Sequence, residues 1–161
     1  MWGSITPDTN NVCDWSTAPF NNGSSSYNET YFNSVKDDVC PNGILAKEYD
    51  AARANMGGDW RMPTQTEWQE LLNNTTNEWT QVNGVNGRKF TASNGNSIFI
   101  PAAGECHNGS VNNVGISGGV WSSSLYASDP RSAWSLRFAS GSCGVQVDNR
   151  YNGRSVRGVR T

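Results

Sequence analysis

Residues 133–139 read AWSLRFA, and residues 143–148 read CGVQVD. In both stretches an apolar side chain alternates with a polar or small one, which is the pattern of a strand with one buried face. The intervening SGS at residues 140–142 is typical of a turn. The sequence therefore predicts a β-hairpin whose core-facing side chains are Trp134, Leu136 and Phe138. The side chains predicted on its open face are those of Ser135, Arg137, Gly144, Gln146 and Asp148.

Shorter strand signals lie on both sides of this hairpin. Residues 155–159 predict a last strand, in which a bulge near Gly158 would restore the alternation. Upstream, residues 88–92 and 97–100 predict a second hairpin, and residues 80–82 predict one more strand. The Asn-Gly pairs at residues 83–84 and 86–87 predict turns. Residues 104–119 are rich in Gly and Asn and predict a long loop.

Helix signals are confined to the first half of the chain. Thr64 and Glu67 have the spacing of a capping box, so a helix is predicted to begin directly after Thr64. The apolar stripe of this helix would be formed by Trp68, Leu71 and Leu72. Residues 48–56 predict a shorter helix that ends at Gly57. Residues 1–46 are predicted to be mostly loop, held against the domain by aromatic side chains.

The bulk composition favours a single domain over residues 1–161. The net charge of −2 is too small to suggest a nucleic-acid partner. No apolar run is long enough to span a membrane, and the first residues lack the basic and apolar regions of a signal peptide. Some of the arginines in the last third of the chain are interpreted as buried pairing partners at strand ends and the others as chance occupants of the open face, rather than as a phosphate-binding site.

The usual catalytic and metal-binding patterns are missing from the sequence. His107 is the only histidine, and no serine stands in a G-x-S-x-G motif that could pair with it. Cys106 is adjacent to His107, and neighbouring side chains point apart in an extended chain. His107 is therefore predicted to be solvated. The four cysteines contain no C-x-x-C pair, which argues against a zinc site. They are predicted to be free thiols or to include one disulfide, with Cys13 and Cys40 as the candidate pair. The sequence predicts no catalytic residue, no metal and no cofactor.

A series of motifs occurs in order between residues 45 and 160. They are GDWRMPT at 58–64, NGVNG at 83–87, NSIFIPAAG at 96–104, WSSS at 121–124 and SVRGVR at 155–160. In these motifs the chain resembles the Fibrobacter succinogenes major paralogous domain, a family common in Bacteroides-type bacteria and their phages. The resemblance implies an α+β protein with a C-type lectin fold of the formylglycine-generating-enzyme-like branch. Such a fold has short antiparallel strands, two helices and long loops.

Residues 120–160 also resemble the variable repeat of a diversity-generating retroelement target protein. The framework that carries this resemblance is WSSS at 121–124, RYNG at 150–153 and SVR at 155–157. In such systems a reverse transcriptase copies a template with errors at adenines, so that positions between framework residues vary. The resemblance implies that the varied positions form a ligand-binding face. These positions are Tyr126, Asp129, Arg131, Ser132, Ser135, Arg137, Ala139, Ser142, Gly144, Gln146 and Asp148.

Three functions follow, in order of preference. The first is a recognition module that binds a protein or glycan ligand, displayed on a cell surface or phage particle outside the cytoplasm. The second is a fixed-specificity adhesin or glycan-binding domain of the same fold, although the sugar-binding motifs EPN, QPD and WND are missing. The third is an oxidase of the formylglycine-generating type, which would require Cys106 and Cys143 to meet in space.

Overall fold

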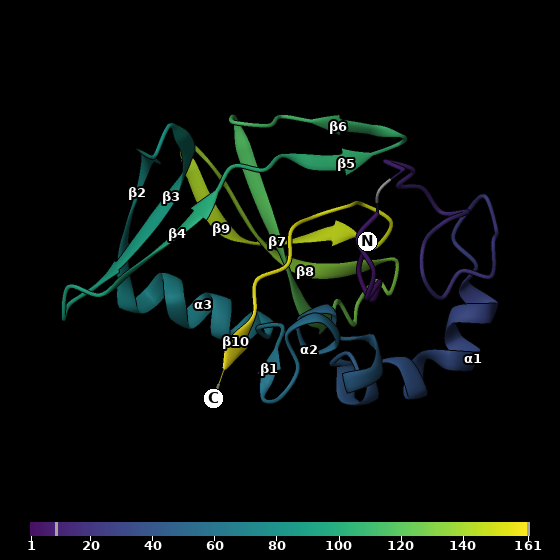
Figure 1. Cartoon of the computed structure of the whole chain (residues 1–161). Coiled ribbons are helices and arrows are strands. Elements are labelled where there is room, and N and C mark those ends of the chain that lie inside the picture. The colour runs from purple at the N-terminus through teal and green to yellow at the C-terminus, as the bar shows by residue number, and fades with distance from the viewer. Residues whose placement is uncertain (9, 161) are drawn as a thin grey trace.

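The computed structural model describes residues 1–8 and 10–160 (Figure 1). It shows a mixed α+β protein with short, mostly antiparallel strands and few helices. The helices are α1 (Glu29–Val39), α2 (Ala51–Met56) and α3 (Gln65–Asn74), with 3-10 turns at Pro41–Gly43 and Lys47–Tyr49. The strands are β1 (Trp60–Arg61), β2 (Thr75–Val82), β3 (Val85–Ala92), β4 (Ser97–Pro101), β5 (Glu105–His107), β6 (Ser110–Asn112), β7 (Ser117–Leu125), β8 (Ser132–Ala139), β9 (Ser142–Asn149) and β10 (Val159–Arg160).

The predicted C-terminal hairpin is confirmed as β8 and β9, and it forms a three-stranded antiparallel sheet with β7. This sheet occupies the middle of the molecule, between the β2–β3–β4 sheet and the loops around α1 (Figure 1). Leu136 and Phe138 are buried against α3 and the β2–β3–β4 sheet, in a cluster with Trp68 and Phe90. Gly118 on β7 lies directly against the Phe138 ring, so a side chain there would collide with it. The hairpin therefore contributes the core side chains that its alternation predicts.

Trp134 departs from this pattern. It lies on the same side of β8 as Leu136 and Phe138, but its side chain is only half-buried. It packs edge-on against Tyr126, with ring centroids 5.3 Å apart. The prediction that Trp134 enters the core is therefore wrong. Trp134 stands near the start of β8, where the Tyr126 ring covers it only in part.

The opposite face of the sheet is covered at one end by the N-terminal part of the chain. Trp121, Leu125 and Ala133 are buried there in a second cluster with Trp2 and Phe32. The Trp2 indole donates a hydrogen bond of 2.9 Å to the Ser122 carbonyl, which attaches the start of the chain to β7. Aromatic residues therefore anchor the N-terminal segment, as predicted.

The N-terminal segment contains a helix that was predicted to be loop. Asn28 caps α1 by accepting a hydrogen bond of 3.0 Å from the Tyr31 N–H, and Glu29 stands in the first turn. Phe32 and Val39 are buried on one side of α1, and Val35 packs beside them. The cap and this apolar spacing were present in the sequence and indicate a helix.

The two predicted helices are both present. The capping box of Thr64 and Glu67 starts α3, as predicted. Arg61 holds the same Glu67 carboxylate through two hydrogen bonds of 2.7 and 2.6 Å. The helix predicted at residues 48–56 begins later, as α2, because Asp50 acts as its N-cap and accepts a hydrogen bond from the Arg53 N–H.

The Arg61–Glu67 pair makes stability depend on pH. The Arg61 guanidinium and the Thr64 N–H lower the pKa of Glu67 from 4.5 to about 2. Because the folded-state pKa is the lower one, the contribution of this carboxylate is complete above about pH 5 and is lost as the pH falls towards 2. We expect the melting temperature of Glu67→Gln to lie below that of the wild type at pH 6, with the gap closing towards pH 2. A gap that is constant over thermal melts from pH 6 to 2 would contradict this.

The second predicted hairpin is confirmed as β3–β4, and β2 extends it to a three-stranded sheet. Asn83 and Gly84 form the β2–β3 turn, both with positive φ (48° and 82°), as predicted. The turn predicted at residues 86–87 is wrong, because both residues lie inside β3. Gly87 accommodates the Phe99 ring and the Ile100 carbonyl of β4, and this close approach is why glycine stands there.

The remaining expectations for the connecting segments are partly wrong. The loop predicted at residues 104–119 contains the β5–β6 hairpin and the start of β7. The last strand predicted at residues 155–159 is not continuous. Ser155 makes a single parallel bridge to Val120, while β10 pairs with β1. In Figure 1 this yellow segment runs along β7 before it reaches β10, and it covers the edge of the central sheet.

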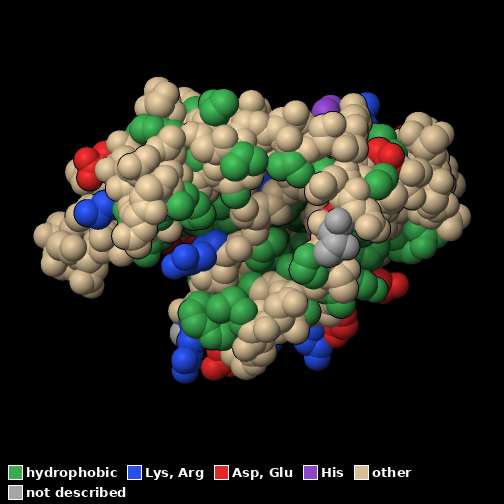
Figure 2. Space-filling model, turned by 45° about the horizontal axis from the view of Figure 1, so that its top comes forward, with side chains coloured by type: hydrophobic (Ala, Val, Ile, Leu, Met, Phe, Trp, Pro, Cys, Tyr) green, Lys and Arg blue, Asp and Glu red, His purple; other side chains and the backbone are tan. Residues whose placement is uncertain are grey.

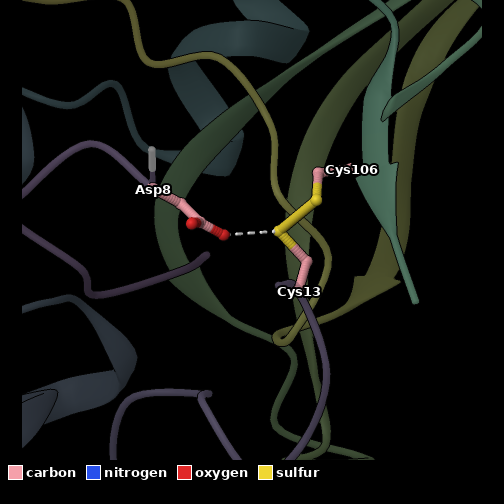
Figure 3. A group of neighbouring side chains, drawn as sticks. All are labelled: Asp8, Cys13 and Cys106. Atoms are coloured by element: carbon pink, nitrogen blue, oxygen red, sulfur yellow. Dashed lines mark hydrogen bonds between the residues drawn. A yellow bond between two sulfur atoms is a disulfide. The ribbon is translucent and has the colours of Figure 1, made fainter. Parts of the chain in front are cut away.

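The disulfide joins Cys13 to Cys106, with Cα atoms 5.9 Å apart (Figure 3). The predicted pairing of Cys13 with Cys40 is therefore wrong, since Cys40 is a buried free thiol at the C-terminal end of α1. Cys143 is also free and is half-buried on the α3 side of β9. Among the described residues, no helix has the length and apolar character needed to cross a bilayer.

Candidate ligand-binding face

The β8–β9 register brings most of the candidate residues onto one face of the hairpin. Ser135 stands opposite Gln146, Arg137 opposite Gly144, and Ala139 opposite Ser142. Asp148 pairs with Ala133, so it falls on the same side as these residues. This face is turned away from α3, because Leu136 and Phe138 fill the other side. Alternate residues of β8 thus form one row, alternate residues of β9 form a second, and the two rows lie side by side on one face.

The outer part of this face is accessible. Ser142 and Gln146 are exposed, and Ala139 and Gly144 are half-buried. The Arg137 side chain keeps 39% of its surface exposed. We call these five residues, Arg137, Ala139, Ser142, Gly144 and Gln146, the hairpin face. They can contact a ligand without rearrangement of the core.

Ser135 does not belong to the accessible surface, and its predicted position on an open face is wrong. It is 0% exposed, and its hydroxyl donates to Asp148 Oδ2 at 3.2 Å. The neighbouring strand β7 brings Trp121 opposite Ser135, so the central strand is covered at this point. Ser132 is also buried, with 8% of its surface exposed at the start of β8. The Ser135 hydroxyl therefore lies beneath the accessible residues, while Ser132 stands on the same side of β8 as Trp134 and Leu136.

Asp148 is the centre of a charged network beneath the hairpin face. Its carboxylate lies 2.7 Å from the Arg154 guanidinium and 3.6 Å from that of Arg137. Arg154 also pairs with Glu105 at 2.6 Å, and its side chain is only 3% exposed. Gly119 of β7 provides the space for Arg154, because a Cβ there would collide with the guanidinium. The network ties β9 to the segment that follows it and to β5.

His107 joins the same network, although it was predicted to be solvated. Its ring is half-buried, and Nδ1 lies 2.8 Å from Asn152 Oδ1. The Asn152 amide in turn donates to Asp148 at 3.4 Å. Sequence reasoning missed this role because residues 107, 148 and 152 meet only after β5 bridges to Gly153. Within residues 1–8 and 10–160, the hydrogen-bond partners of the His107 ring are Asn152 and Asn108, and neither of them is a nucleophile.

The remaining candidate residues lie in the connection between β7 and β8. Asp129 and Arg131 form an exposed ion pair of 2.9 Å, and the Arg131 guanidinium lowers the pKa of the Asp129 carboxyl. Tyr126 is half-buried against Trp134. These three residues extend the accessible surface beyond one end of the hairpin, and they are separate from the row formed by β8 and β9.

Arg88 of β3 holds the opposite end of the hairpin. Its guanidinium donates to the carbonyl of Ala139 at 2.7 Å, and to those of Ser140 and Ser142 at 3.4 Å. Asn77 of β2 orients the guanidinium by accepting from Arg88 Nε at 2.8 Å. The turn of the hairpin is thus attached to the β2–β3–β4 sheet.

Arg150 fixes the chain where β9 ends. Its side chain is 0% exposed, and its guanidinium stands 4.0 Å from the Phe32 ring centroid, with Trp2, Trp15 and Tyr27 around it. It donates to the Pro130 carbonyl at 2.7 Å. Burial lowers the pKa of Arg150 to about 10, and the guanidinium faces aromatic rings. This arginine connects β9 to the β7–β8 connection and to the N-terminal segment.

Substitutions at Asp148 and at Arg137 should affect stability differently, because Asp148 belongs to the buried network and Arg137 to the hairpin face. We expect Asp148→Asn to lower the free energy of unfolding by about 1–3 kcal/mol, because buried Arg154 loses a charged partner. Arg137→Ala should change it by less than about 0.5 kcal/mol, since 39% of the side chain is exposed and its 3.6 Å contact with Asp148 is longer than a hydrogen bond. Urea unfolding of both variants measures the difference. Equal effects would show that the two positions do not differ in structural role.

The geometry defines a class of protein: a rigid α+β domain that presents an accessible hairpin face and a buried charged network beneath it. Residues 1–160 match the Lcl C-terminal domain, and the chain belongs to this family. Family membership supports the interpretation of the chain as similar to the variable proteins of diversity-generating retroelements. No curated protein and no solved structure matches the chain, so the predicted C-type lectin fold and its formylglycine-generating-enzyme-like branch stay predictions.

Proposed function

We propose that this protein is a recognition module that binds a macromolecular ligand through the hairpin face and the adjoining β7–β8 connection. The observation that carries the proposal is the β8–β9 register, which sets Arg137 opposite Gly144 and Ala139 opposite Ser142 on the side away from α3. A rigid scaffold with an accessible face of mixed chemistry suits recognition. The ligand would be a protein or a glycan on a cell or phage surface.

We also propose that the accessible positions vary between copies of the gene through retroelement mutagenesis. The hairpin face contributes no large apolar side chain to either core cluster, so substitution there need not disturb packing. Ser132, Ser135 and Asp148 differ from the other candidates because they are buried or lie in the charged network. If they vary as well, the replacements should be restricted in size or charge.

Sequencing the 3′ half of the gene in many isolates of one lineage tests this proposal. Substitutions should concentrate at the codons of the hairpin face and at Tyr126, Asp129 and Arg131, and they should correspond to adenines of a nearby template repeat. The codons of Leu136, Phe138 and Arg150 serve as internal controls and should stay constant. Substitutions spread evenly over both sets of codons would refute diversification.

The second candidate is an adhesin or glycan-binding domain with fixed specificity. The involvement of Asp148 and Ser135 in buried contacts favours it, because a face that depends on particular residues beneath it tolerates less change. In that case the same codons would be invariant in the lineage, while Arg137→Ala and Gln146→Ala would still abolish binding to a glycan array. Binding by the wild type with an invariant gene would therefore select this alternative.

A binding role without catalysis fits the site better than oxidase chemistry. Cys106 is bonded to Cys13, and Cys143 lies on the α3 side of β9, so the cysteine pair required by the third hypothesis is not formed. The proposal therefore includes no catalytic residue, metal or cofactor. It places the protein outside the cytoplasm, on a cell surface or phage particle, and the disulfide supports this because such bonds persist in oxidising compartments.

A further inference from the structure

A pocket of about 540 Å³ lies outside the hairpin face, between the N-terminal segment, α2 and the residues that follow β9. Its volume is within the range of small-molecule sites in proteins. One wall is formed by residues 4–8, another by Ala51, Asn55 and Met56 of α2, and a third by residues 153–156. The Cys13–Cys106 disulfide closes one side. None of the residues of the hairpin face lines this pocket.

Aliphatic side chains gather at the rim of the pocket while staying accessible to solvent. Ile5, Met56, Val111 and Val156 are exposed by 41%, 51%, 48% and 41%, and all of them line it. Figure 2 shows hydrophobic side chains around the hollow on this face of the molecule. The side chains come from four separate segments of the chain, so the fold itself collects them. A ligand that enters here would cover apolar surface that the domain leaves open.

The charges in the pocket wall favour a cation. Glu105 and Arg154 line it but are paired with each other at 2.6 Å. The Asp8 carboxylate, in contrast, forms no ion pair with a Lys, Arg or His side chain among residues 1–8 and 10–160. Its Oδ2 atom lies 3.0 Å from Cys13 Sγ, beside the disulfide (Figure 3). Disulfide bonding removes the thiolates that could otherwise bind a metal together with this carboxylate.

The α-ammonium of Met1 feels the charge of the Asp8 carboxylate. Burial lowers the pKa of the Met1 α-ammonium, and the Asp8 carboxylate raises it. Met1 itself lines the pocket. Burial is the larger of the two effects, so an ammonium in this position is partly desolvated, and the Asp8 carboxylate offsets part of that cost.

We propose that the pocket binds a primary alkylammonium group, with the aliphatic chain against Ile5, Met56, Val111 and Val156 and the ammonium at Asp8. The observed apolar rim and the single unpaired carboxylate are complementary to the two halves of such a ligand. A free diamine and the side chain of a lysine on another protein share this chemistry. The proposal concerns a site separate from the hairpin face and does not depend on its function.

Titration of the full chain with hexylammonium, followed by 15N–1H NMR, tests the proposal. We expect saturable shifts at the amides of Val111 and Val156. Hexanoate and 1-hexanol have the same aliphatic chain but lack the ammonium, so they should bind roughly tenfold more weakly, a difference of about 1.4 kcal/mol. Cadaverine and Nα-acetyl-lysine methylamide then distinguish a free diamine from a lysine side chain as the preferred source.

Asp8→Asn should weaken hexylammonium binding by roughly the same factor, while Asp59→Asn, an exposed carboxylate outside the pocket, serves as the matched control. A chain with residues added before Met1 has no α-ammonium in the pocket, and it should bind hexylammonium at least as tightly. The proposal is overturned if no shift occurs in this extended chain. Equal binding of hexanoate, or of the Asp8→Asn variant, would also overturn it.

Discussion

Replacing Cys13 and Cys106 by serine will lower the free energy of unfolding by about 4–5 kcal/mol, the value expected for a loop of this size. The bond closes a loop with a sequence separation of 93 residues. It also joins the N-terminal segment to β5, which belongs to the wall of the pocket and stands beside the charged network. Loss of the bond should therefore loosen the N-terminal segment first, which amide hydrogen exchange in that segment will report.

Urea unfolding of the oxidised wild type and of the double variant measures this effect. Cys143→Ser provides the matched control, because it removes a half-buried free thiol and no cross-link. Dithiothreitol should destabilise the wild type and leave the double variant unchanged. A wild type that is insensitive to the reductant would contradict the assignment of the disulfide.

Phe138→Ala should lower the free energy of unfolding by about 3–5 kcal/mol, the range for removing a buried aromatic ring from a core. Phe138 is 3% exposed and lies in the cluster between the central sheet, α3 and the β2–β3–β4 sheet. The Gly118 backbone lies directly on its ring, so the cavity could not be filled by a side chain from β7. The effect should appear as a lower urea midpoint with an unchanged slope.

The loss of unfolding free energy in Trp134→Ala, on the same strand, should be compared with the loss in Phe138→Ala. Alternation alone predicts equal losses for both residues, whereas the half-buried position of Trp134 predicts a clearly smaller loss. The smaller loss expected for Trp134→Ala comes from removing the Tyr126–Trp134 contact. If Trp134→Ala proves as destabilising as Phe138→Ala, the assignment of Trp134 to the rim of the sheet is mistaken.

Some local rules located elements correctly, although the cap of α1 was overlooked and the Asn-Gly pair at residues 86–87 was misleading. Period-two alternation placed Leu136 and Phe138 in the core, and the spacing of Thr64 and Glu67 marked the start of α3. Alternation reports only which side of a strand a residue occupies. It says nothing of what covers that side, so Ser135 was assigned to the surface although β7 and Asp148 bury it.

Contacts between distant segments were not predictable in this way. Spacing alone does not determine how four cysteines pair, and Cys13 meets Cys106 only because the N-terminal segment passes beside β5. The network of Asp148, Arg154 and Glu105 likewise depends on the return of the chain along β7. The candidate residues could be named from the resemblance, but their division into accessible and buried members required the fold.

The contacts that Arg88 makes with the hairpin determine which substitutions its tip tolerates. Its hydrogen bonds go to the main-chain carbonyls of Ala139, Ser140 and Ser142, and every amino acid supplies such a carbonyl. A new side chain at residue 139 or 142 therefore leaves the anchor intact. Substitutions there can change what the tip of the hairpin displays without changing how the tip is held.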